Sequence, residues 1–209
     1  MTRRFHPAIR FLHWTMALLV IAMLFIGAGM VSTAGPAYTA LIALHRPLGI
    51  AILLLAGIRL AIRLGTGAPP LPAGLPRLQQ RAARASHVLL YLAMIGMPLI
   101  GWAMLSAGGY PVHLSAGVVL PPIVPQDAVA YGLLRRAHGL VAFAFFALIL
   151  GHLTAALVHG FVRRDDVLAT MGFARTRPPG ADTLADESGP EAGEESGDDT
   201  ASADPAQTP

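Results

Sequence analysis

Four stretches of this chain are long and apolar enough to cross a lipid bilayer, and they constrain its fold more than any other feature. They cover residues 11–31 and, approximately, residues 41–60, 87–105 and 137–162. A helix needs roughly 20 apolar residues to span the hydrocarbon core. The first stretch is too long for the apolar core of a signal peptide, and no clear cleavage site follows it. The sequence therefore predicts an all-α integral membrane protein, a four-helix bundle.

The composition supports a membrane protein and excludes several kinds of cofactor site. Only 13% of the residues are charged and 54% are hydrophobic, whereas a soluble domain has about 25% charged residues. The chain has no cysteine. Disulfides, thiolate metal sites, iron–sulfur clusters and haem attached through cysteine are therefore excluded.

The charges are separated along the chain, and their placement predicts an orientation. Between Met1 and Arg164 there are 13 arginines against one acid, Asp127, a net charge of +12. Nine of these arginines lie in three segments that share one side of the membrane: the N-terminus, the link between the second and third spans, and the segment after the fourth span. Three lie in the other two links: Arg46, Arg135 and Arg136. The excess of arginine on the first side predicts that both termini are cytoplasmic, in a bacterial inner membrane.

The same placement argues against nucleic acid as a partner, because the arginines lie at the ends of apolar spans and not on a soluble basic face.

Two domains are expected: residues 1–173 form the membrane bundle, and residues 174–209 form a disordered acidic tail. The tail is rich in Pro, Gly, Ala, Ser, Thr and acidic residues, with too few large apolar residues to form a core. The outer link, residues 106–136, is expected to be a long loop that ends in a short interfacial helix, "QDAVAYGLLRR".

Two histidines in the fourth span, His138 and His152, are 14 residues apart. On a helix this spacing rises about 21 Å and falls about 40° short of four full turns. The two side chains therefore lie on nearly one face, near opposite edges of the membrane. Ionisable groups inside a membrane are costly and usually face the interior of the bundle. The spacing predicts two buried ligand sites, one above the other.

Each of these sites has a second histidine at a matching depth. His13 lies early in the first span, at the inner side with His152, and His45 lies early in the second span, at the outer side with His138. Two imidazoles that face each other across a bundle suit bis-histidine haem and electron transfer. Zinc fits less well because it needs three or four ligands. The alternative is that all four are ordinary interfacial histidines.

Further polar residues lie near the predicted ligands. Arg46, Arg135 and Arg136 could attract an anion to the outer side, pair with haem propionates, or serve only topology and lipid headgroups. His87 and His159 could line an inner pocket that binds and protonates a quinone. His87 could instead replace His13 or His152 as a ligand, and both could be simple interfacial histidines.

The sequence resembles the bacterial cytochrome b561 family, the four-helix di-haem b proteins, over about residues 5–173. The resemblance rests on five segments: "RFLHW", "LHRPLG", "SHVLLYLAMIGMPLIGW", "AHGLVAFAFFALILGHLTAALVH" and "RRDDVLATM". It implies two haem b groups held by His13, His45, His138 and His152. One departure is Pro47, where a small polar residue is expected. Proline suits the first turn of a helix, so we expect it not to disturb His45.

For close relatives the resemblance implies oxidation of superoxide with electrons passed to ubiquinone. The expected partners are therefore superoxide, quinone and the lipid bilayer. The wider family includes cytochrome b subunits of hydrogenases and other dehydrogenases, so the first alternative is an electron-transfer subunit that docks such a periplasmic partner. A second alternative is a non-redox membrane scaffold, which would bind no pigment.

Overall fold

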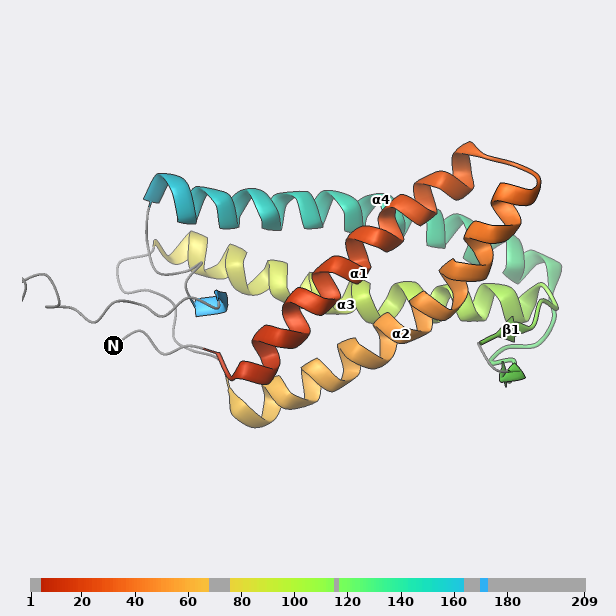
Figure 1. Ribbon diagram of the computed structural model, residues 1–209, viewed down its shortest axis with the longest axis horizontal. Helices are drawn as coiled ribbons and strands as arrows, with labels where there is room; N and C mark the ends of the chain where they lie inside the picture. The colour runs from red at the N-terminus through yellow and green to blue at the C-terminus, as the bar shows by residue number, and fades with distance from the viewer. Residues whose placement is uncertain (1–4, 68–75, 115–116, 164–169, 173–209) are drawn as a thin grey trace, which may run out of the picture. The chain divides into compact units, whose positions relative to one another are not determined.

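The computed structural model describes residues 5–67, 76–114, 117–163 and 170–172, and the described part is dominated by four long helices (Figure 1). These are α1 (Pro7–Ser32), α2 (Pro36–Thr66), α3 (Arg77–Ala107) and α4 (Ala128–Leu157), and a π-helix, η2 (Val158–Arg163), continues α4. All four are long and apolar enough to cross a membrane. The predicted all-α membrane bundle is confirmed. The predicted disordered tail lies outside the described residues.

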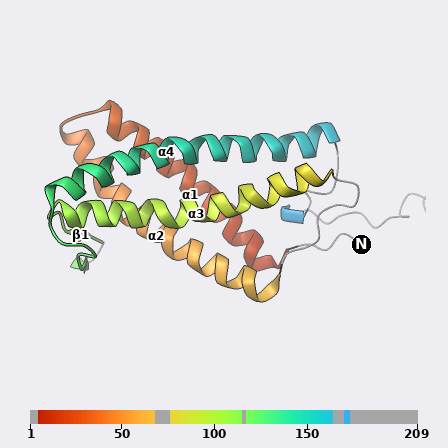
Figure 2. The ribbon, with the colours of Figure 1, turned by 180° about the vertical axis from the view of Figure 1, so that it is seen from behind.

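The helices form two antiparallel pairs. The most extensive contacts are between α1 and α2 and between α3 and α4, and α2 also packs against α3. The α1–α2 pair crosses the α3–α4 pair at an angle, as the front and back views show (Figures 1 and 2). We call the end that holds the start of α1 the inner end, the predicted cytoplasmic side, and the opposite end the outer end.

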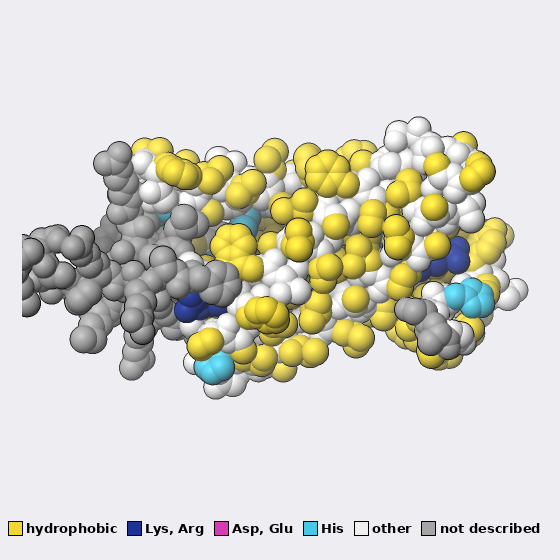
Figure 3. All heavy atoms as spheres, in the orientation of Figure 1, with side chains coloured by type: hydrophobic (Ala, Val, Ile, Leu, Met, Phe, Trp, Pro, Cys, Tyr) yellow, Lys and Arg dark blue, Asp and Glu magenta, His cyan; other side chains and the backbone are white. Residues whose placement is uncertain are grey.

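The buried core is small and the outside of the bundle is apolar. Buried residues from all four helices meet in one cluster: Met16, Val20, Ile52, Ala56, Met94 and Phe145. Large apolar side chains such as Phe25 and Phe143 are more than three-quarters exposed. On the face shown in Figure 3, hydrophobic side chains cover the length of the bundle, and the arginines lie near its two ends. This is the surface that a bilayer would cover.

Local sequence explains where the helices begin and end. Pro36 is at the first position of α2, where a missing amide proton costs nothing. Gly67 ends the same helix with a φ of 74°, which disfavours residues with a side chain. Asp127 caps α4, because its side chain accepts a hydrogen bond of 2.7 Å from the Ala130 amide.

The outer connection is shorter than predicted. The predicted interfacial helix "QDAVAYGLLRR" is wrong as a separate element, because the Asp127 cap starts α4 at Ala128 and the helix continues unbroken. The remaining link, residues 108–127, contains two short strands, β1 (Val112–His113) and β2 (Val119–Leu120), which pair antiparallel with Val112 opposite Leu120. Trp102 donates a hydrogen bond of 3.0 Å to the Pro121 carbonyl and so ties this link to α3.

The prediction for Pro47 is also wrong. We expected it in the first turn of a helix, but α2 starts at Pro36 and Pro47 lies inside it. A proline at an interior position cannot donate to the carbonyl four residues earlier and tends to kink the helix. α2 bends in its outer half (Figure 1), and His45 lies in this half, next to the proline.

Candidate functional site

The outer histidine pair is formed by His45 on α2 and His138 on α4. The centres of their rings are 6.2 Å apart, and both side chains are half-buried. The Nδ1 atom of His45 is buried without a hydrogen-bond partner. The two helices therefore bring together the two imidazoles that the sequence pattern paired.

Three imidazoles meet at the inner end. His13 on α1 and His152 on α4 have ring centres 6.4 Å apart. His87 on α3 also faces His152, with 5.7 Å between ring centres. The predicted pair His13–His152 is thus present, and His87 joins it. His87 thus lies beside the inner pair, where it could line the predicted quinone pocket or act as the alternative ligand.

The ring separations suit two ligands on opposite sides of one metal ion. A metal-bound imidazole nitrogen lies about 2 Å from its ion and the ring centre about 1 Å further out, so two opposed rings stand about 6 Å apart. Both predicted pairs are near this value. Within the described part of the chain, no three His, Asp or Glu side chains are arranged to hold a single ion. Two-imidazole sites are therefore what this arrangement offers.

Gly101 on α3 lies directly against the outer pair, and the sequence pattern did not indicate it. A Cβ at this position would lie 3.2 Å from Cε1 of His138 and 3.5 Å from its Nδ1. The absence of a side chain here lets the His138 ring lie against α3. Three other glycines that lie close in sequence to the paired histidines, Gly49, Gly139 and Gly151, make no such contact with a histidine.

The three outer arginines differ in their surroundings. Arg46 follows His45, is half-buried, and has a buried Nε without a hydrogen-bond partner. Arg135 and Arg136 are exposed, and Arg135 donates a weak hydrogen bond of 3.4 Å to the Tyr131 hydroxyl. Asp127 is the only acid in the described part of the chain, and its carboxylate caps α4. The outer end therefore carries an uncompensated positive charge.

The inner end contains a second arginine group that the sequence interpretation left unused. Arg59 on α2 is only 7% exposed, and its guanidinium lies 5.5 Å from the centre of the Tyr91 ring. Arg63, one turn later, lies 5.5 Å from the Phe5 ring. A sequence signal for Arg59 does exist. It follows His45 by 14 residues, the same spacing that separates His138 from His152 on α4.

The other predicted quinone-pocket residue, His159, lies half-buried in η2. Such π-helical turns often occur at functional sites. Nearby, Arg163 of η2 donates a hydrogen bond of 3.0 Å to the Gln79 side chain of α3. This bond joins α3 and the end of α4 at the inner end.

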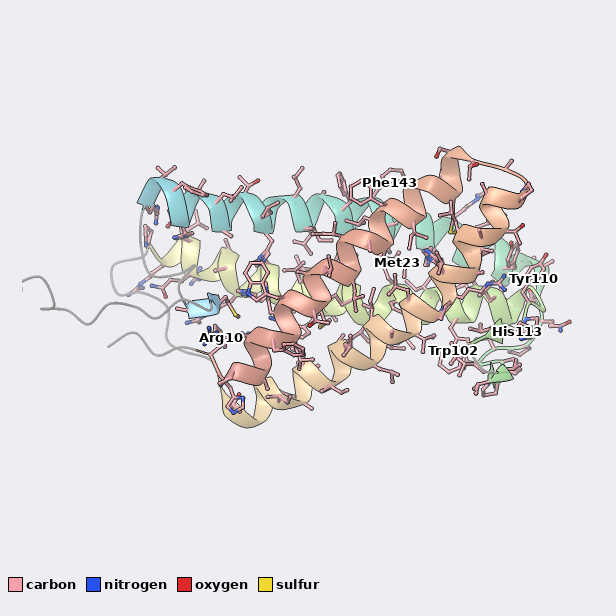
Figure 4. All side chains as sticks on the ribbon, viewed as in Figure 1. Arg10, Met23, Trp102, Tyr110, His113 and Phe143 are labelled. Carbon is pink, nitrogen blue, oxygen red and sulfur yellow. The ribbon has the colours of Figure 1, made fainter. Side chains whose placement is uncertain are left out.

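A short segment, residues 170–172, lies against the start of α1. Trp14 donates a hydrogen bond of 3.0 Å from its indole nitrogen to the Met171 carbonyl, and Arg10 donates to the Gly172 carbonyl. Figure 4 shows Arg10 beside this segment, and shows Trp102, Tyr110 and His113 at the opposite end of the bundle. Because Trp14 also packs edge-on against His13, this segment lies close to one of the inner imidazoles.

Comparison with known proteins places this arrangement in a family. Residues 4–174 match the family described as prokaryotic cytochrome b561. Two similar proteins are cytochrome b561 homologs 1 and 2 of Escherichia coli (strain K12). The first is 27% identical over 171 residues, which cover 80% of this chain and 96% of the relative. The second is 28% identical over 162 residues, which cover 76% and 86%.

A third relative carries a more specific name. It is a probable superoxide oxidase, CybB, of Yersinia pestis, 30% identical over 128 residues that cover 61% of this chain and 72% of the relative. The family match extends over the whole bundle. It includes the helices that carry His13, His45, His87, His138 and His152. The chain therefore belongs to the prokaryotic cytochrome b561 family, whose members transfer electrons in the bacterial inner membrane.

Proposed function

We propose that this cytochrome b561 is a superoxide oxidase that passes electrons to ubiquinone. Two superoxide anions each lose one electron at the outer end and become dioxygen. Ubiquinone takes up these two electrons and two protons at the inner end and becomes ubiquinol. The observation that carries the proposal is the presence of two imidazole pairs, one at each end of the bundle, with ring centres 6.2 and 6.4 Å apart.

The family implies haem b, and the residues present fit it. His45 and His138 would hold one haem, and His13 and His152 the other, because the imidazoles of each pair have ring centres 6.2 and 6.4 Å apart. The buried Nδ1 atoms of His13 and His45, which have no partner, and the side-chain-free surface at Gly101 agree with this fit. When bound, haem would supply reversible one-electron transfer.

The outer arginines would bring superoxide to its site. Three arginines lie close in sequence to the outer histidines: Arg46, Arg135 and Arg136. Asp127, the one acid among the described residues, accepts a hydrogen bond at the start of α4. A positive field of this kind accelerates the encounter with a small anion. The name of the Yersinia pestis relative supports superoxide as the donor.

The inner end would bind the quinone. His87 and His159 can donate hydrogen bonds to quinone oxygens and deliver protons to them. His87 lies on α3, next to α4, and the centre of its ring is 5.7 Å from the centre of the His152 ring. Its position beside the inner pair would keep the quinone close to the source of electrons, and the inner end faces the cytoplasm, which supplies protons.

Purified protein without any partner tests this proposal. We expect superoxide to reduce the haem within the mixing time of the experiment at low salt, and added ubiquinone to be converted to ubiquinol. The reduction rate should fall with ionic strength, because 0.1 M salt screens charges beyond about 10 Å. Replacing Arg135 and Arg136 with Gln should slow it at least several-fold and flatten the salt dependence, with haem content unchanged.

A matched control removes the same charge from the inner end. Arg77 and Arg81 are exposed near the start of α3, and replacing both with Gln should leave superoxide-driven reduction unchanged. If superoxide fails to reduce the haem at low salt and reduction requires a dehydrogenase or hydrogenase, the docking-subunit function replaces the one proposed here.

A further inference from the structure

Arg59 is a buried cation without a described counter-ion. It is one of two buried polar or charged side chains among the described residues, at 7% exposure. Its Nε has no hydrogen-bond partner, and the same is true of the neighbouring Arg63 Nη1 and Tyr91 hydroxyl. The single acid of the described part, Asp127, caps α4 at the outer end. Two arginines one turn apart on α2, and the Tyr91 hydroxyl on α3, thus have buried polar atoms without an acceptor in the described part of the chain.

This arrangement is costly unless an anion completes it. An unpaired charge buried in a protein is strongly destabilising. The Tyr91 ring, 5.5 Å from the guanidinium, offsets only part of this cost through a cation–π contact. Arg63 makes the problem worse, because it places a second positive charge one helical turn away. A bound anion would compensate both charges.

The anion must lie beside the inner imidazoles. The guanidinium of Arg59 lies 5.5 Å from the centre of the Tyr91 ring, and Tyr91 is one helical turn after His87 on α3. The His87 ring in turn faces His152, with 5.7 Å between ring centres. Arg59 also lies seven residues before the end of α2, about 10 Å inside the helix end along the axis. A lipid phosphate stays at the membrane surface, and ubiquinone is neutral. The remaining anion at this depth is a carboxylate of a haem held by the inner imidazoles.

We propose that Arg59, with Arg63 and the Tyr91 hydroxyl, forms a carboxylate-binding site for a propionate of the inner haem and thereby raises the reduction potential of that haem. A guanidinium matches a carboxylate with two parallel hydrogen bonds, and Tyr91 can donate a third. A positive charge beside the haem favours the added electron. The inference rests on the proposed haem content but not on superoxide as the donor. It makes Arg59 a positioning residue for electron flow toward the inner end.

The test is a potentiometric titration of both haems in the purified full-length holoprotein. Arg59→Gln should lower the midpoint potential of the inner haem and leave the outer haem unchanged. Arg59→Lys should cause a smaller shift, because it keeps the charge but loses the planar fork. Arg81→Gln, which removes an exposed arginine from the same end, should shift neither haem. An unchanged inner potential in Arg59→Gln, or a defect confined to ubiquinone reduction, would overturn the proposal.

A second measurement covers the case in which Arg59→Gln loses the inner haem. The full-length chain, produced without haem, is loaded with haem b or with its dimethyl ester, whose propionates carry no charge. The wild-type inner site should bind haem b more tightly than the ester, and Arg59→Gln should lose that preference. A variant that discriminates as strongly as the wild type would refute the site. A wild-type chain that binds no haem would instead refute the proposed function. The potentiometric titration uses chemical reductants, so it can be carried out even if superoxide is not the donor.

Discussion

At the residue scale, the outer site depends on a contact between a ring and a backbone. Because a Cβ at Gly101 would lie 3.2 Å from the His138 ring, alanine there requires a small movement and leucine a large one. We predict that Gly101→Leu loses the outer haem and keeps the inner one, whereas Gly101→Ala keeps both. Haem per chain and the reduced visible spectrum measure this.

Gly57 provides the matched control for that prediction. It is an exposed glycine inside α2 with open space where a Cβ would be, so Gly57→Leu should retain both haems and gain helix propensity of up to about 1 kcal/mol. Loss of haem in this control as well would mean that leucine harms the bundle in general, and not through His138.

The histidine pairs were predictable from the sequence, and the Gly101 contact was not. The 14-residue spacing in the fourth span places His138 and His152 on one face of the helix, at two depths in the membrane. A further histidine at each depth then completes the pairs His13–His152 and His45–His138. The position of Gly101 depends on the rotation of α3 about its axis, which residue spacing within α3 does not determine. Arg59 was predictable in principle, because it repeats the same spacing on α2.

At the scale of elements, the prolines inside α2 and α3 lie at the level of the outer pair. Pro47 is two residues from His45, and Pro98 is three residues from Gly101. Pro47 leaves the Ala43 carbonyl without its helical donor and favours a bend. We expect the bend to influence the direction of the His45 ring, two residues before the proline.

Pro47→Ala tests this role. The variant should let α2 straighten, move His45 relative to His138, and lower the outer haem content or shift its reduced absorption band, while the inner haem stays unchanged. Pro36→Ala is the control, because a proline at the first helical position does not disturb hydrogen bonding. An outer haem that is identical in content and spectrum after Pro47→Ala would show that the bend is irrelevant to the site.

The element boundaries illustrate why the prediction of the outer link failed. Apolar periodicity indicated the membrane-embedded part of α4 but not its extension beyond the bilayer. The extension begins at Asp127, whose carboxylate bonds to the Ala130 amide. A capping residue is visible in a sequence, but the arginines at 135 and 136 suggested a membrane boundary, and a helix can continue through such a boundary without a break.

At the scale of the whole molecule, composition predicts that residues 1–173 fold as the bundle and that residues 174–209 do not contribute to it. All predicted ligands, the outer arginines and both quinone-pocket residues lie within it. We predict that a chain truncated after Arg175 keeps its full haem content and its superoxide-driven reduction rate. Loss of either haem in the truncated chain would show that the acidic tail contributes to the folded bundle.

The central claim, two haem sites each formed by a specific histidine pair, is tested most directly by haem per chain in single alanine variants. The wild type should hold two haems. His45→Ala and His138→Ala should each hold one haem with the inner potential, and His13→Ala and His152→Ala one haem with the outer potential. His87→Ala should keep both haems and slow only ubiquinone reduction. One haem in the wild type, or loss of the inner haem in His87→Ala with retention in His13→Ala, would contradict the account.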